Sequence, residues 1–297
     1  MTELFDIVYP NQPLEKTYEV GLVITTYNRP FYLHRTLASL RKSDLSSTVV
    51  MMIDDNSTNY LTNQLLESLT LAKTPVIKAF RKEKEGCRMY ENLQFGWDFL
   101  SENFHCKYLT NLDPDVLVQP HWISALKELH ELGQSKNEEI LVTGFNAYQH
   151  PIIEEKETYY IKKSLGGINF FFNQNLYQKI IRAKLINLSF DFRVGDAMEE
   201  NNYPILCTKP SVVQHIGRAG LWSGMKVGTF DYAIDFGDVS PLWMKVRLFY
   251  FEHSKREGKL LYKRLTVVKQ FFQKMFYRLF FNRLYTANRN QDNGQQH

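Results

Sequence analysis

Tyr108-Leu-Thr-Asn-Leu-Asp113-Pro-Asp115-Val-Leu-Val118 is a short apolar run interrupted by two carboxylates. An Asp-x-Asp at the end of a strand can hold a divalent cation and leave room for a diphosphate, because hard cations take oxygen ligands. A solvated turn is the alternative, since Asp and Pro are ordinary turn residues. The segments on either side of this run decide between the two interpretations.

Apolar runs rich in β-branched residues alternate with segments of helical spacing through the first half of the chain. We expect strands at 19–25, 48–53, 75–80 and 107–112, a later strand at 205–208, and helices at 31–40, 60–71 and 89–100. This alternation predicts an α/β fold with a mostly parallel sheet flanked by helices. Ligands of such sheets gather at the carboxyl ends of the strands.

Polar side chains follow three of these expected strands directly. They are Thr25, the pair Asp54 and Asp55, and the pair Asp113 and Asp115. Their common position predicts one site at one edge of the sheet, which favours a cation–diphosphate site over a solvated turn.

The length and composition limit the number of domains, the presence of a membrane span and the compartment of the protein. A chain of 297 residues suits one large α/β domain with an appendage, or two small domains. No run approaches the roughly 18 apolar residues of a membrane span, and the N-terminus has no secretory pattern. Three scattered cysteines fit a reducing cytoplasm better than a disulfide framework. We therefore expect a cytoplasmic protein.

The charge is unevenly distributed along the chain. Residues 241–297 carry 12 Lys and Arg against three acids, a net of +9, so residues 1–240 carry −5 of the total +4. Bulky aromatic side chains interleave with these cations. Three parts are expected: a lead-in at 1–18, irregular through residue 17, a catalytic domain at 19–240, and a basic amphipathic helical tail at 241–297.

Four motifs, in this order, resemble the nucleotide-sugar glycosyltransferases of the GT-A (Rossmann-like) fold, close to glycosyltransferase family 2. They are Val23-Ile-Thr25-Thr-Tyr27-Asn28-Arg29-Pro30, Ile53-Asp54-Asp55-Asn-Ser57, Leu112-Asp113-Pro-Asp115 and Ser164-Leu-Gly166-Gly167-Ile-Asn169. The resemblance covers about residues 19–220. It implies a transferase that takes a sugar from a nucleotide-diphospho-sugar donor, with UDP as the expected nucleotide.

The resemblance implies that the first three motifs bind the nucleotide. It implies that Thr25 and Tyr27 line the uracil or ribose pocket, and that Asp55 accepts a hydrogen bond from the base, with Asp54 as the alternative. A carboxylate can accept the imide N–H of uracil, and a Tyr ring can stack on the base. A helix cap or Asx-turn is the structural alternative for the Asp pair.

Further nucleotide-binding residues are expected around these positions. The residues are Asn28, Arg29, Asp113, and, from the loop and helix that follow 75–80, Gly86 and Asn92. Arg88 or Lys84 could offset phosphate charge, although a charge run is more often a solvated face.

The metal ligands expected from the resemblance are Asp115, Asp113 and His215. Neutral imidazole can ligate a transition metal, and an Asp/Asp/His set would suit Mn²⁺, with Mg²⁺ as the alternative. A histidine that only makes hydrogen bonds within the fold is the competing interpretation of His215.

The second half of the site carries the donor sugar and the acceptor. The resemblance places backbone of Gly166 and Gly167 against them, which the absence of a Cβ permits. An inverting transferase also needs a general base. The resemblance implies a base about a dozen residues before a Gly-Tyr-like helix end, and Asp191, 12 residues before Tyr203, matches this better than its rival, Asp196. Trp222, in a mixed aromatic and basic segment, is either part of a lid over the donor or a connector.

The prediction is an inverting, metal-dependent glycosyltransferase with a hydroxyl of a glycan or lipid-linked glycan as acceptor, in surface polysaccharide or lipopolysaccharide assembly. Residues 241–285 would bind an anionic membrane surface or pack on protein, and no nucleic-acid partner is expected. The alternatives are a nucleotidyltransferase of related fold and a noncatalytic membrane-associated assembly protein.

Overall fold

The computed structural model describes residues 2–83, 88–217 and 232–237. All of them belong to the first of two units, Met1–Ser240. The expected basic tail at 241–297 lies outside the described residues.

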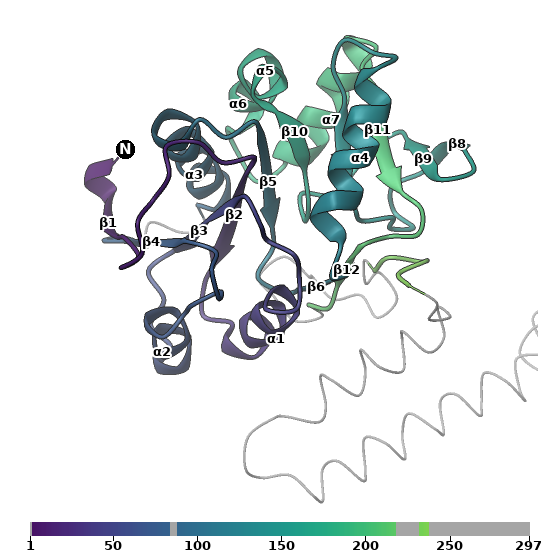
Figure 1. The fold of residues 1–297 in the computed structure, drawn as a ribbon. Coiled ribbons are helices and arrows are strands. Elements are labelled where there is room, and N and C mark those ends of the chain that lie inside the picture. The colour runs from purple at the N-terminus through teal and green to yellow at the C-terminus, as the bar shows by residue number, and fades with distance from the viewer. Residues whose placement is uncertain (1, 84–87, 218–231, 238–297) are drawn as a thin grey trace, which may run out of the picture. The chain divides into compact units, whose positions relative to one another are not determined.

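Parallel strands form the half of the sheet that the sequence predicts (Figure 1). The order is β4-β3-β2-β5, with each neighbouring pair parallel. The strands are β2 (Val20–Thr26), β3 (Thr48–Asp54), β4 (Val76–Arg81) and β5 (Tyr108–Leu112). The helices between them are α1 (Pro30–Leu40), α2 (Tyr60–Glu67) and α3 (Met89–Phe104). The mostly parallel α/β architecture is confirmed.

The second half of the sheet is mixed. The ten-stranded sheet continues from β5 in the order β10-β7-β11-β9-β8, and only the β7–β11 pair in this half is parallel. These strands are β7 (Leu141–Thr143), β8 (Ile152–Glu155), β9 (Tyr159–Lys162), β10 (Phe171–Asn173) and β11 (Ile205–Thr208). The helical segments are α4 (Trp122–Gln134), α5 (Gln174–Leu176), a π-helical turn η2 (Tyr177–Ile181), α6 (Arg182–Lys184) and α7 (Phe190–Glu200).

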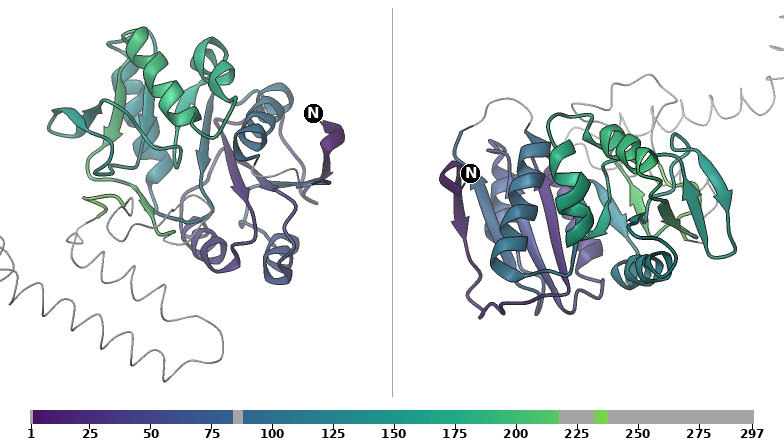
Figure 2. Two further views of the ribbon diagram at one scale, coloured as in Figure 1. Left: turned by 180° about the vertical axis from the view of Figure 1, so that it is seen from behind. Right: turned by 90° about the horizontal axis from the view of Figure 1, so that it is seen from above.

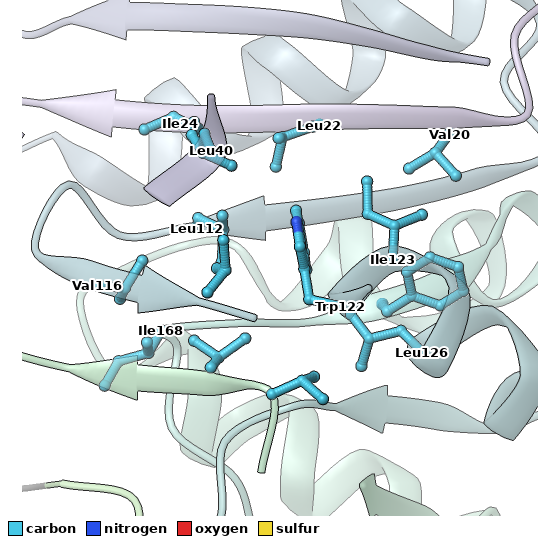
Figure 3. Packing of buried hydrophobic residues seen from close by; sticks show 14 of the residues in the cluster. Val20, Leu22, Ile24, Leu40, Leu112, Val116, Trp122, Ile123, Leu126 and Ile168 are labelled. Carbon is cyan, nitrogen blue, oxygen red and sulfur yellow. The ribbon is translucent and has the colours of Figure 1, made fainter. Parts of the chain in front are cut away.

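Two apolar layers cover the faces of the sheet, because successive strand residues point to opposite faces. In β2, Leu22 and Ile24 belong to the layer with α1, α2 and α4, whereas Val23 belongs to the layer with α3 and α7. Figure 2 shows these helices on the two sides of the sheet. Leu22 of β2 and Trp122 and Leu126 of α4 belong to the first layer (Figure 3), and each is fully buried.

A small two-stranded sheet joins the Asp-x-Asp segment to the last described strand. Here β6 (Val116–Val118) pairs antiparallel with β12 (Val213–His215). His215 is the register partner of Val116, so the pairing brings His215 next to Asp115.

The N-terminal segment differs from the expected irregular lead-in. Residues Thr2–Leu4 form a 3₁₀ turn, η1, and Phe5–Val8 form β1, which pairs antiparallel with β4. The buried Phe5 ring stacks on Phe95 with centroids 4.1 Å apart. A four-residue edge strand is too short for its alternation to stand out within a polar sequence.

Candidate active site

The carboxyl ends of the parallel strands open on a cavity of about 750 Å³. Most of the site residues expected from the sequence line it. They are Thr25, Tyr27, Asn28, Arg29, Asp55, Asn92, Asp113, Asp115, Gly166, Gly167, Asp191 and His215. The fold therefore brings together residues from four separate motifs. Gly86 and Trp222 lie outside the described residues.

Asn28 and its loop are held by the neighbouring loop after β3. Asn28 has a φ of 46°, a left-handed conformation that Asn tolerates better than most residues. Its Oδ1 accepts hydrogen bonds from the backbone N–H groups of Thr58 at 2.8 Å and Asn59 at 2.7 Å. Its own backbone N–H donates to Ser57 Oγ at 2.9 Å. Asn28 thus acts first as a link between two loops of the cavity wall.

Asp54 and Asp55 have different environments, which separates the two candidates for the base-binding carboxylate. Asp54 Oδ2 accepts from the backbone N–H of Ser57 at 2.8 Å and Oδ1 from the Ser57 hydroxyl at 2.5 Å, so both oxygens of Asp54 are bound within the turn that follows β3. Asp55 lines the cavity and Asp54 does not. Of the two, Asp55 is the residue that a ligand in the cavity could reach.

Two side chains from neighbouring elements, Asn92 and Arg81, contact the Asp55 carboxylate. Asn92 Nδ2 of α3 donates to Asp55 Oδ1 at 3.0 Å, and Arg81 Nε of β4 lies 3.2 Å from the same oxygen. Arg81 also donates to Asn92 Oδ1 from Nε at 3.1 Å and from Nη2 at 2.7 Å. All three side chains are buried. Sequence reasoning identified Asn92 and missed Arg81, whose position as the last residue of a strand was the available signal.

Asp113 and Asp115 flank Pro114 at the centre of the cavity wall. Asp115 Oδ2 lies 2.5 Å from Arg29 Nη1 and 3.2 Å from His215 Nε2. Burial and the neighbouring Asp115 raise the pKa of Asp113. Burial would also raise the pKa of Asp115, but His215 and Arg29 outweigh it and lower that pKa. One carboxylate of the pair is therefore held strongly in its charged form.

The chemistry of Asp113, Asp115 and His215 suits a divalent cation. Two carboxylates and an imidazole line the same cavity, and carboxylate and imidazole are ligand types that Mn²⁺ accepts. Gly217 also leaves space for Asp115, since a Cβ there would lie 1.7 Å from Asp115 Oδ2. Among the described residues, no three such side chains are already grouped as metal ligands. Arg29 holds the oxygen that a cation would use, so binding there requires the guanidinium to shift.

A second part of the cavity lining, formed by the glycine segment and the start of α7, carries Asp191. Its Oδ2 accepts from the Gly167 backbone N–H at 3.3 Å and its Oδ1 from the Phe192 backbone N–H at 2.9 Å. Burial raises the pKa of Asp191 despite these hydrogen bonds. A partly buried carboxylate with a raised pKa is suited to accept a proton.

Asp196 is exposed on α7 and does not line the cavity. The glycine segment, in contrast, is fixed beside the Asp-x-Asp motif. Asn111 Nδ2 donates to the Gly167 carbonyl at 2.7 Å, and the Asp113 backbone N–H donates to the Ile168 carbonyl at 3.1 Å. Of the two candidate bases, the geometry favours Asp191.

Two further side chains of this wall have no counterpart among the sequence predictions. His150 is buried, its Nδ1 lies 3.1 Å from Ser164 Oγ, and burial lowers its pKa to about 4, so the ring is neutral at pH 7. Phe192, beside Asp191, is 60% exposed although it lines the cavity. The loop before β8 and the turn into α7 showed no motif from which either could be found.

No helix within the described ranges has the length and apolar composition of a membrane span.

Comparison with known proteins places this geometry in context. A family model described as glycosyl transferase family 2 matches residues 22–181. A comparison with curated proteins finds no match. Among solved structures, the chain is similar to GalNAc-T7, crystallised with UDP, GalNAc and Mn²⁺, with a TM-score of 0.52 and 17% identity over 71% of this chain and 46% of that one.

It is also similar to S. aureus TarS 1-349, with a TM-score of 0.44 and 14% identity over 64% of this chain and 57% of that one. The chain spans about half the length of these two structures. The likeness to GalNAc-T7 shows the fold, which is GT-A. Because the family model covers more than half of the sequence, the chain belongs to glycosyl transferase family 2.

Proposed function

We propose that this protein is an inverting glycosyltransferase that moves a sugar from a UDP-linked donor to a hydroxyl of a glycan acceptor. The observation that carries the proposal is that one cavity is lined by Asp55, the Asp113/Asp115 pair and Asp191. The family assignment favours it over the nucleotidyltransferase alternative.

The donor would occupy the wall formed by the parallel strands. Tyr27 and Asp55 would bind the base, by stacking and by accepting an imide N–H respectively. Asp113, Asp115 and His215 would hold a Mn²⁺ or Mg²⁺ ion, which supplies positive charge to the leaving diphosphate. Arg29 already places a guanidinium at this point and could pair with phosphate oxygens once it leaves Asp115.

The acceptor would enter from the wall that contains Asp191. Its hydroxyl oxygen would form a bond to the anomeric carbon of the donor while its proton passes to the Asp191 carboxylate. The bond between that carbon and the diphosphate oxygen breaks, and the nucleotide diphosphate leaves with the electron pair. The exposed ring of Phe192 could stack against the acceptor sugar.

Hydrolysis of a panel of nucleotide sugars tests the proposal. We expect release of UDP from at least one UDP-sugar, dependent on Mn²⁺ or Mg²⁺, and loss of release in Asp115→Ala. Absence of binding and turnover across the panel would favour the noncatalytic assembly protein instead.

The pathway and membrane parts of the proposal rest on the sequence. The net charge of +9 and the interleaved aromatic residues of 241–297 support contact between residues 241–285 and an anionic membrane, on the cytoplasmic side, where surface glycans are assembled. Full-length protein should bind anionic vesicles at low salt and release them as salt rises. A full-length protein that ignores such vesicles at low salt would leave packing on protein as the role of the tail.

A further inference from the structure

Arg81 does not line the cavity, but it contacts two residues that do, Asp55 and Asn92. It is 7% exposed at the end of β4, and β1 covers it: Phe5 is its register partner, with the Phe5 ring centroid 4.9 Å from the guanidinium carbon. A buried guanidinium is costly unless its donors are satisfied. Its partners therefore indicate what it does.

The partners of Arg81 are arranged in sequence toward Asp55. Two of its N–H groups converge on Asn92 Oδ1, which fixes the orientation of the Asn92 amide. That orientation directs Asn92 Nδ2 to Asp55 Oδ1, which Arg81 Nε also approaches at 3.2 Å. Both contacts to this oxygen therefore depend on Arg81. The other acid facing Arg81 is Glu91, whose Oε2 lies 3.4 Å from Nη2.

The second oxygen of Asp55 is left for a ligand. Within the described part of the chain, Asp55 Oδ2 accepts no hydrogen bond, although Asp55 lines the cavity. A carboxylate held in this way presents an acceptor and no donor. Uracil offers a ring N–H at N3 to such an oxygen, whereas cytosine offers a lone pair at N3 and is repelled.

We propose that Arg81 is a positioning residue that sets nucleobase selectivity: by occupying Asp55 Oδ1, directly and through Asn92, it keeps Oδ2 as an acceptor for the imide N–H of uracil and against cytosine. The inference rests on the proposed function, because it requires a nucleotide in this cavity. Without Arg81, the Asn92 amide can turn over and the Asp55 carboxylate loses both contacts that fix its Oδ1. Asp55 Oδ2 is then no longer held toward the base, so selectivity for uracil falls as well as affinity.

Calorimetric titration of UDP and of CDP, each with Mn²⁺, into the full-length chain tests this assignment. We expect the wild type to prefer UDP by about tenfold or more, the scale of leaving a buried polar group unpaired. Arg81→Gln and Arg81→Met should lose most of that preference, with weaker UDP binding and no loss of CDP binding. Arg81→Lys keeps the charge without the forked donors and should retain a preference reduced severalfold.

Arg182→Met is the matched control. Arg182 also forms a two-point pair with a carboxylate, from Nε to Asp98 Oδ1 at 2.8 Å and from Nη2 to Asp98 Oδ2 at 3.1 Å, and neither residue lines the cavity. This variant should keep the wild-type ratio of UDP to CDP affinity. Thermal unfolding of each variant separates loss of fold from loss of selectivity.

The outcomes separate this inference from the proposed function. A wild type that binds neither nucleotide overturns both. A wild type that prefers UDP, together with a cooperatively melting Arg81→Gln or Arg81→Met that keeps the same ratio, overturns the role of Arg81 alone. An unchanged ratio in Arg81→Lys would overturn it equally, because a lysine ammonium cannot reproduce the forked contact with Asn92.

Discussion

The two walls of the cavity are held in different ways. On the donor wall, which contains Asn28, Asp55 and Asp115, side chains link the loops after the parallel strands to one another and to α3, as with Asn28 to Thr58 and Asn59, or Asn92 to Asp55. On the acceptor wall, Asp191 begins a helix, receives backbone hydrogen bonds, and stands beside a Phe192 that is 60% exposed. The family match, residues 22–181, ends before that helix. The two walls therefore differ in how their side chains are fixed, and only part of the cavity lining falls within the family match.

The largest expected effect comes from a substitution on the acceptor wall alone. Asp191→Asn removes the proposed general base, so sugar transfer should fall about 100-fold or more, the usual scale of such a loss. Affinity for UDP should stay near wild type, because the hydrogen bonds of Asp191 go to the backbone of Gly167 and Phe192 and not to the loops proposed to bind the nucleotide. Steady-state transfer rates and calorimetry of UDP measure the two effects.

Asp196→Asn is the control for that substitution, since Asp196 is exposed on the same helix and does not line the cavity. It should keep both transfer and UDP binding. An inactive Asp196→Asn beside an active Asp191→Asn would show that the wrong carboxylate was assigned as the base.

A smaller effect is expected from Gly217→Ala, which adds a methyl group to the backbone beside Asp115 on the donor wall. The Cβ of Gly217→Ala would lie 1.7 Å from Asp115 Oδ2 and 2.7 Å from Arg29 Nη2, so Asp115 has to move. We expect Mn²⁺-dependent UDP affinity to fall about tenfold, a loss on the order of one charge-assisted hydrogen bond. Calorimetry with and without Mn²⁺ measures it.

Gly195→Ala is the matched control on the acceptor wall. Its Cβ would meet nothing closer than the Ser164 Cα and Cβ atoms at 4.0 Å, and an Ala within a helix is favoured over Gly. This variant should bind UDP as the wild type does and melt at the same or a higher temperature. Equal UDP affinity in Gly217→Ala and Gly195→Ala would contradict the role given to Asp115.

The smallest effect concerns pH. Burial raises the pKa of Asp191, and a base must be deprotonated to act. Transfer should therefore decline on acidification at a pH above the ordinary Asp pKa of about 3.9. At saturating donor, binding of the donor by Asp113 no longer limits the rate. The acidic limb of the kcat profile therefore reports the pKa of Asp191. An acidic limb at the ordinary Asp pKa would mean that burial does not raise the pKa of Asp191.

The parallel half of the fold could be predicted from the sequence because each strand is a continuous apolar run. β2 and β3 are buried at every position, and each ends at a polar motif. In the second half, the strand at 205–208 was predicted and is confirmed as β11, but its neighbours could not be predicted in the same way. Strands such as β7 and β10 have three residues each, and β8 is exposed throughout, so neither length nor periodicity marks them.

The same contrast holds within the site. The motif Asp54-Asp55 predicted a base-binding carboxylate, but only the Ser57 contacts of Asp54 distinguish the two residues. Arg81 was missed because its function depends on a partner in α3, and His150 because its position depends on the pairing of distant segments. Local sequence identifies residues that follow a strand end, and it does not identify the side chains that hold them.

The most direct test of the separation between the walls is titration of UDP, with and without Mn²⁺, into Asp115→Ala and Asp191→Asn side by side. The account predicts that Asp115→Ala loses the Mn²⁺-dependent part of UDP binding, because a charged ligand is gone and the diphosphate charge is uncompensated, while Asp191→Asn binds UDP as the wild type does. Unchanged Mn²⁺-dependent binding in Asp115→Ala, or an equal loss in both variants, would contradict it.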